Sequence, residues 1–91
     1  MLEYHAAYFK EPDGWFVVEL ADFPGVCSQG RTLRSARFMI RDALRFMAEC
    51  MVEAGDSLPK PNSKLKPSIG KKPDFVEKVP LRTRFQTPVR K

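Results

Sequence analysis

Only a few side chains in this sequence have the type and spacing that chemistry requires. His5 is the one histidine of the 91 residues, and the two cysteines, Cys27 and Cys50, stand far apart in the chain. A zinc site needs several cysteine or histidine ligands at short spacings, and this pattern excludes one. We therefore expect no metal and no other cofactor. We also expect both thiols to be reduced and buried, as free cysteines usually are.

Asp13 and Glu19 are the remaining candidates for acid–base or metal-dependent nuclease chemistry. Two carboxylates can share a metal ion or a proton only where the fold brings them together, and nothing in this spacing requires that. His5 has no serine, cysteine or aspartate partner in a recognisable motif, so we expect a hydrogen-bonded strand histidine. The sequence thus predicts no catalytic residue, and a protein that is not an enzyme.

The stretch FPGVCSQGRTLRSA at residues 23–36 raises the question of a phosphate-binding loop. A dinucleotide fingerprint needs three glycines at another spacing, and a Walker A loop needs Ser or Thr where IGKKP has a second lysine. We interpret Gly25 and Gly30 as turn positions that flank a short strand. Thr32 is then a good N-cap for a helix, although Ser35 in place of Glu or Gln predicts an incomplete capping box.

Three strands are predicted before that helix. Residues 2–9 (LEYHAAYF) and 15–20 (WFVVEL) are rich in aromatic and β-branched side chains. The turn EPDG at residues 11–14 joins them as an antiparallel hairpin. Residues 26–29 (VCSQ) form the third, shorter strand.

A long amphipathic helix is predicted from about residue 33 to residue 53, with Gly55 just beyond its end. The residues on its sheet-facing side are Leu33, Ala36, Ile40, Ala43, Leu44, Met47 and Met51. Phe38 lies off this side and Phe46 at its border, and large aromatics in such places often contact a second subunit. Together with Trp15, they are the residues predicted for self-association or partner contact.

The composition changes from residue 59 onward. Residues 59–73 hold four prolines and five lysines, which disfavour helix and interior strand and predict a linker or extended arm. Residues 74–81 (DFVEKVPL) could form a last strand, and residues 82–91 a basic tail, after a core over residues 1–58. The predicted fold class is α+β, a three-stranded antiparallel sheet covered by one long helix, in the order β-β-β-α-β if the last strand joins.

Charge separates the two parts of the chain. The net charge of +5 combines six basic and nine acidic residues in 1–58 with ten basic and two acidic residues in 59–91. Two parts of opposite charge suggest either that the basic tail binds nucleic acid or that it lies on the acidic core of its own chain. The residues predicted for nucleic-acid contact are Lys71, Lys72, Arg82, Arg84, Arg90 and Lys91. The N-terminus has no signal-peptide pattern, and no apolar run could span a bilayer, so we expect a cytoplasmic protein without a membrane partner.

The turn and helix-start motifs together resemble one known family. The stretch DGWFVVELADFPGVCSQGRTLRSA, the helix after it and GDSLPKP are similar to the HicB-type antitoxins over about residues 4–61. The matching positions that we expect to determine the fold are Gly14, Pro24, Gly25, Gly30, Thr32 and Ala36.

This resemblance implies a partial ribonuclease-H-like fold without the catalytic carboxylates. It also implies that the chain forms a homodimer or homotetramer, and that it binds and blocks a small ribonuclease toxin of the HicA type. Many members carry a C-terminal DNA-binding domain, which the Pro- and Lys-rich sequence after residue 58 does not match, so a solo N-terminal domain is predicted. The alternative function is a nucleic-acid-binding or oligomeric scaffold protein that uses the basic C-terminal tail.

Overall fold

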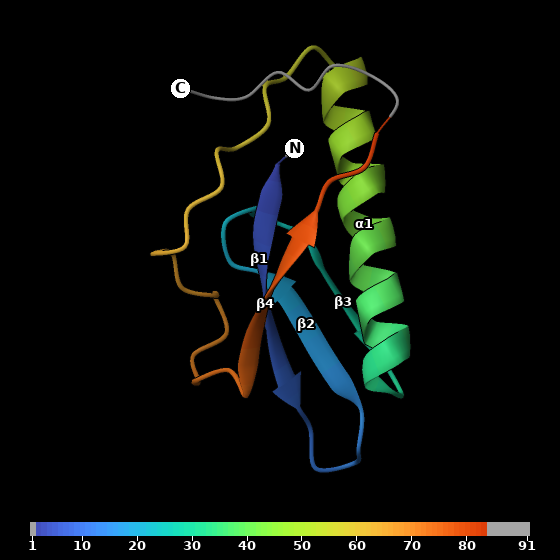
Figure 1. Ribbon diagram of the computed structural model, residues 1–91, viewed down its shortest axis with the longest axis vertical. Coiled ribbons are helices and arrows are strands. Elements are labelled where there is room, and N and C mark those ends of the chain that lie inside the picture. Colours follow the sequence, from blue (N-terminus) through green and yellow to red (C-terminus); the bar gives the residue numbers. More distant parts are fainter. Residues whose placement is uncertain (1, 84–91) are drawn as a thin grey trace.

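The structure, a computed structural model, describes residues 2–83 and contains one sheet and one helix (Figure 1). The elements in chain order are β1 (Glu3–Lys10), β2 (Phe16–Leu20), β3 (Cys27–Gly30), α1 (Leu33–Glu53) and β4 (Phe75–Pro80). The sheet is antiparallel throughout and has the strand order β3-β2-β1-β4. The predicted α+β class and the β-β-β-α-β order are confirmed, and the last strand does join the sheet.

Two tight turns connect the first three strands. Between β1 and β2, the backbone N–H of Glu11 donates to the carbonyl of Trp15 at 2.8 Å, and Gly14 has a φ of 92°. Between β2 and β3, the N–H of Leu20 donates to the carbonyl of Val26 at 3.0 Å, and Gly25 has a φ of 87°. Both glycines therefore occupy the left-handed region that other residues rarely adopt.

Helix α1 begins and ends with complete caps. The Thr32 hydroxyl accepts from the N–H of Ser35 at 3.0 Å, and the Ser35 hydroxyl accepts from the N–H of Thr32 at 3.2 Å. The prediction of an incomplete capping box was therefore wrong, because a serine hydroxyl also reaches the N-cap N–H. At the other end, Gly55 has a φ of 83°, and the N–H of Asp56 donates to the carbonyl of Met51, as in a Schellman motif.

One face of the sheet packs against α1 and forms the apolar core. The helix contributes four fully buried residues, Ala36, Ile40, Leu44 and Ala48. The predicted face is confirmed, with Ala48 in addition. Gly30 is needed here for a different reason than the turn we predicted, because its φ is not positive. A Cβ on Gly30 would lie 2.5 Å from the backbone nitrogen of Ala36, so only glycine lets the helix start this close to β3.

The other face of the sheet is covered by residues 59–73, which we call the arm. Strand residues alternate between faces, so Ala7 and Phe9 point away from the cluster that contains Tyr4 and Tyr8, yet both are buried. In Figure 1 the arm runs beside the sheet, on the side away from α1, before the chain enters β4. Within residues 2–83, no helix is both long and apolar enough to cross a membrane.

Candidate functional site

His5 has an acidic partner that the sequence analysis missed. Its Nδ1 lies 2.7 Å from Oδ2 of Asp22, whose side chain is completely buried. The same carboxylate accepts from the backbone N–H of His5 at 2.8 Å and from the N–H of Asn62 in the arm at 2.9 Å. Asp22 therefore ties β1 to the arm, and His5 is the hydrogen-bonded strand histidine that we predicted. No local motif joins residues 5, 22 and 62, so this contact depends on the tertiary fold.

The two carboxylates considered for nuclease chemistry serve separate structural contacts. Asp13 accepts from the N–H of Trp15 at 3.0 Å within the first turn. Glu19 lies on β2 and accepts from the backbone N–H groups of Ser68 and Ile69, at 2.6 and 3.4 Å. Over residues 2–83, no group of three or more His, Cys, Asp or Glu side chains is placed to hold a metal ion.

Carboxylates of the core hold the arm along its length. Besides Asp22 and Glu19, Glu11 forms an ion pair with Lys71 at 3.0 Å, and the Lys71 ammonium lies 5.8 Å from the centre of the Phe9 ring. At the start of the arm, the Tyr4 hydroxyl donates to the carbonyl of Pro59 at 2.6 Å. Residues 59–73 are thus a docked arm rather than a free linker.

The basic residues predicted for nucleic-acid contact have different positions. Lys71, Lys72 and Arg82 are all exposed, and of these three Lys71 is the one that is engaged, by Glu11 and Phe9. Arg84, Arg90 and Lys91 lie outside the described residues.

Both cysteines are exposed, which corrects the prediction that they are buried. Cys27 pairs with Glu19 in the register of β2 and β3, so its side chain faces away from α1 on an edge strand. Cys50 lies on the outer side of α1. Free cysteines are usually buried, but this general preference did not hold at these two positions.

The outer side of α1 presents large apolar side chains. Phe38 and Phe46 are 60% and 63% exposed, and Met39 is exposed beside them. Trp15 is only half-buried, and the Arg31 guanidinium lies 5.3 Å from its ring centre, in a cation–π arrangement. The exposure of the two phenylalanines is as predicted, and their role as contact residues stays a prediction.

Charge along α1 opposes the helix dipole. A helix is stabilised by acidic residues near its N-terminus and basic residues near its C-terminus. Here the first turn has no acidic residue and the last turn no basic residue. Instead Arg34 lies near the start, and Glu53, with Asp56 just beyond, lies near the end. This arrangement does not favour the helix itself.

One ion pair joins α1 to β4. Nε of Arg37 donates to Oε1 of Glu77 at 3.0 Å, and a second guanidinium nitrogen contacts the other carboxylate oxygen. The hydrogen bonds from Arg37 lower the pKa of Glu77. Burial, followed by the nearby Glu77 charge, raises the pKa of Tyr8 to about 12.

Known structures show that this is an established fold. The chain matches the N-terminal domain of the Burkholderia pseudomallei antitoxin HicB with a TM-score of 0.66 and 23% identity, over 90% of this chain and all of that one. It matches a longer structure of the same antitoxin with a TM-score of 0.69 and 24% identity, over 97% of this chain and 76% of that one. The fold is therefore that of the N-terminal domain of HicB.

The sequence comparisons identify the family. The profile of the HicB-like antitoxin of bacterial toxin–antitoxin systems matches residues 4–82. The chain is also 29% identical, over 62 residues, to the UPF0150 protein Ta0767 of Thermoplasma acidophilum, which covers 68% of this chain and 90% of that protein. The chain belongs to the HicB-like antitoxin family. The family match includes the arm and β4, and so extends beyond the stretch on which the predicted resemblance rested.

Proposed function

We propose that this protein is a non-enzymatic antitoxin that binds and neutralises a small ribonuclease toxin of the HicA type. Family membership supports the antitoxin role. The positions of His5, Asp13 and Glu19 support binding rather than catalysis, since each contacts neighbouring parts of the same chain. Neutralisation would then work by occlusion, with the antitoxin covering the surface on which the toxin binds RNA.

One observation points to the surface that would contact the toxin. Phe46, Glu49 and Glu53 lie three and four residues apart, and therefore on one side of α1. Phe46 is 63% exposed, and Glu53 is exposed as well, whereas Glu49 is paired with Arg45 at 3.1 Å, so within residues 2–83 Glu53 carries the free charge. We call these three residues the acidic patch.

The chemistry of the acidic patch suits a ribonuclease. An RNA-binding surface is basic because it must neutralise phosphates. Opposite charge at an interface speeds association and selects the partner, and aromatic residues, phenylalanine among them, are enriched in protein interfaces. Acidic residues at the C-terminal end of α1 are unfavourable for the helix dipole. Their role would thus be to bind the basic surface of the toxin.

The test is inhibition of a purified HicA-type ribonuclease from the native host by increasing amounts of the antitoxin. We expect stoichiometric inhibition by the unmodified protein, and at least tenfold weaker inhibition by the double variant Phe46→Ala/Glu53→Lys. Glu3→Lys makes the same charge change at an exposed position on β1 and should inhibit normally. Absence of inhibition by the unmodified protein, with only salt-sensitive nucleic acid recovered from the native host, would favour the alternative function.

Self-association through α1 is a second part of this proposal. A domain of this size has a limited core, and the exposed Phe38 and Met39, which lie outside the acidic patch, offer apolar area to another copy. We expect a homodimer or homotetramer in sedimentation velocity at tens of micromolar. Phe38→Glu should weaken it, because a carboxylate would be desolvated at the interface. A monomer at all concentrations for the unmodified protein would contradict this part alone.

A further inference from the structure

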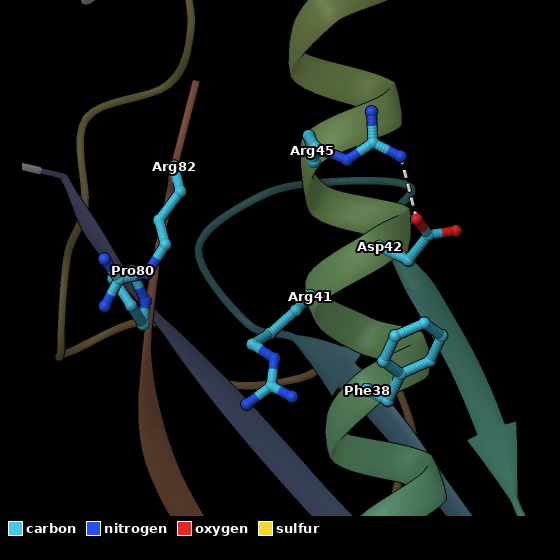
Figure 2. Close-up of a pocket in the computed structure, with 6 residues that line it drawn as sticks. All are labelled: Phe38, Arg41, Asp42, Arg45, Pro80 and Arg82. Atoms are coloured by element: carbon cyan, nitrogen blue, oxygen red, sulfur yellow. Dashed lines mark hydrogen bonds and ion pairs between the residues drawn. The ribbon is translucent and has the colours of Figure 1, made fainter. Parts of the chain in front are cut away.

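A groove lined mainly by arginines lies between α1 and β4 (Figure 2). It has a volume of about 360 Å³ and is lined by Phe38, Arg41, Asp42, Arg45, Pro80 and Arg82. A second hollow of about 270 Å³ shares Arg41 and Pro80 with it and extends to Lys78. We call the two hollows together the arginine groove. Glu77, which is paired with Arg37, lines the second hollow.

The arginine groove has positive charge that the protein itself does not neutralise. Arg45 is paired with Asp42 and Glu49, at 2.8 and 3.1 Å. In contrast, neither Arg41 nor Arg82 has a carboxylate within ion-pair distance among residues 2–83. Figure 2 shows the Arg41 side chain extending from α1 toward β4, and the Arg82 side chain running alongside β4. Two guanidinium groups, one from α1 and one from the residues just after β4, therefore line one concave space.

An exposed aromatic side chain adjoins these charges. Phe38 lines the same groove and is 60% exposed, one helical turn before Arg41. Guanidinium groups that follow a phosphate backbone, beside an aromatic ring on which a base can stack, are the combination that binds single-stranded nucleic acid without sequence preference. A concave site between a helix and a strand admits a single strand more readily than a rigid duplex.

We propose that the arginine groove binds single-stranded nucleic acid. Arg41 and Arg82 contact successive phosphates, and a base stacks on Phe38. The groove has the wrong sign for the basic surface of a ribonuclease, which it would repel. The groove and the acidic patch thus serve different partners, and this inference does not depend on toxin neutralisation. Because Phe38 is also the ring offered for self-association, a second copy and a nucleic-acid base would compete for it. An acidic peptide could satisfy the arginines, but it would leave the exposed ring unused.

The experiment measures fluorescence anisotropy of a labelled oligouridylate or oligothymidylate with the full chain at low salt. We expect Arg41→Gln/Arg82→Gln to weaken binding at least tenfold. This variant should also reduce the slope of log affinity against log salt by about 1.4, because two phosphate contacts to a single strand are lost. Phe38→Ser should weaken binding about fivefold or more and leave the salt slope unchanged, because it removes stacking but no charge.

Two matched controls make the result specific to the groove. Phe46→Ser removes an equally exposed ring from the same helix outside the groove, and Arg34→Gln removes an exposed arginine outside it. Both should bind within twofold of the unmodified protein. The single variant Arg41→Gln is the matched partner of Arg34→Gln and should weaken binding more than that control does. Equal losses for these two single variants would overturn the proposal, since binding would then follow overall charge. It would also be overturned by competition from polyglutamate as strong as from the oligonucleotide, or by no binding at low salt.

Discussion

The two faces of the sheet are covered in different ways. On one face, the helix presents Ala36, Ile40, Leu44 and Ala48 to a continuous apolar cluster. On the other, the arm covers Ala7 and Phe9 and is held by carboxylates of the core, of which Asp22 is buried. The first face depends on apolar area removed from water, which is non-directional. The second depends on a few directional, charge-assisted hydrogen bonds.

Proline explains this difference. The arm has prolines at positions 59, 61, 67 and 73, and a proline has no backbone N–H to add to a sheet ladder. The N–H groups of Asn62, Ser68 and Ile69 instead donate to Asp22 and Glu19. A segment attached at separate points can detach locally while the rest stays folded. We therefore expect the helix-covered face to set global stability and the arm-covered face to open first.

Alkaline pH should have the largest effect, and it should act on the helix-covered face. Burial raises the pKa of both Tyr4 and Tyr8 to about 12, and these are the two tyrosines of the chain. The folded protein thus favours the neutral phenols. Their contribution is fully present below pH ~10, the unfolded value, and is lost as the pH rises toward about 12.

For the two tyrosines together, we expect a loss of about 4–5 kcal/mol in the free energy of unfolding between these limits. Ultraviolet absorbance should show tyrosinate forming together with the loss of helical circular dichroism. Tyrosinate formation near pH ~10 in a protein that stays folded would contradict the burial of both rings.

Truncation of a core residue should be the next largest effect. Leu44→Ala removes a fully buried side chain from the helix face and should reduce the free energy of unfolding by about 3 kcal/mol. Phe46→Ala, two residues along the same helix but 63% exposed, should change it by less than about 0.5 kcal/mol. Urea denaturation measures both values. Similar losses for the two variants would mean that Phe46 is buried in solution, as in a stable dimer.

Removal of the buried carboxylate should release the arm and leave the helix face intact. Asp22→Asn keeps the shape but cannot accept all three hydrogen bonds from His5 and Asn62. We expect a loss of about 2 kcal/mol, in the range for hydrogen bonds to charged groups. In amide hydrogen exchange, the N–H of Asn62 should lose protection while the amides of α1 around Ile40 and Leu44 keep theirs. A uniform loss of protection would show that the two faces unfold together.

The sequence predicted the helix-covered face better than the arm-covered one. The helix bounds follow from Thr32 and Gly55 at its ends, and its buried side from a periodicity within one segment. Docking of the arm depends on Glu19 and Asp22 meeting residues more than 39 positions away, and no local pattern records such contacts. Prolines and lysines therefore predicted a linker or an extended arm without saying whether it docks, although the charge asymmetry did offer a tail on its own acidic core as one alternative.

Of the two kinds of candidate surface, the exposed phenylalanines of α1 could be predicted from the sequence and the arginine groove could not. Phe38 and Phe46 could be placed on the outer side of α1 from helical spacing alone. The arginine groove could not be foreseen, because Arg41 and Arg82 are neighbours only after β4 has joined the sheet beside α1. The sequence does contain a row of arginines, at positions 34, 37, 41 and 45. It does not show which of these arginines form ion pairs with carboxylates of the same chain.

The smallest expected effect is at the middle of the arm. Glu19→Gln keeps one acceptor oxygen but loses the second, so it can hold only one of the N–H groups of Ser68 and Ile69. Because these contacts are partly exposed, we expect a loss of only about 0.5–1 kcal/mol. The more sensitive measurement is limited tryptic proteolysis after Lys64, an exposed lysine in the arm that is followed by a leucine. Cleavage there should be faster than in the unmodified protein, and slower than in Asp22→Asn. If Glu19→Gln instead destabilised the protein as much as Leu44→Ala, the arm would be part of the cooperative core, and the distinction between the two faces would fail.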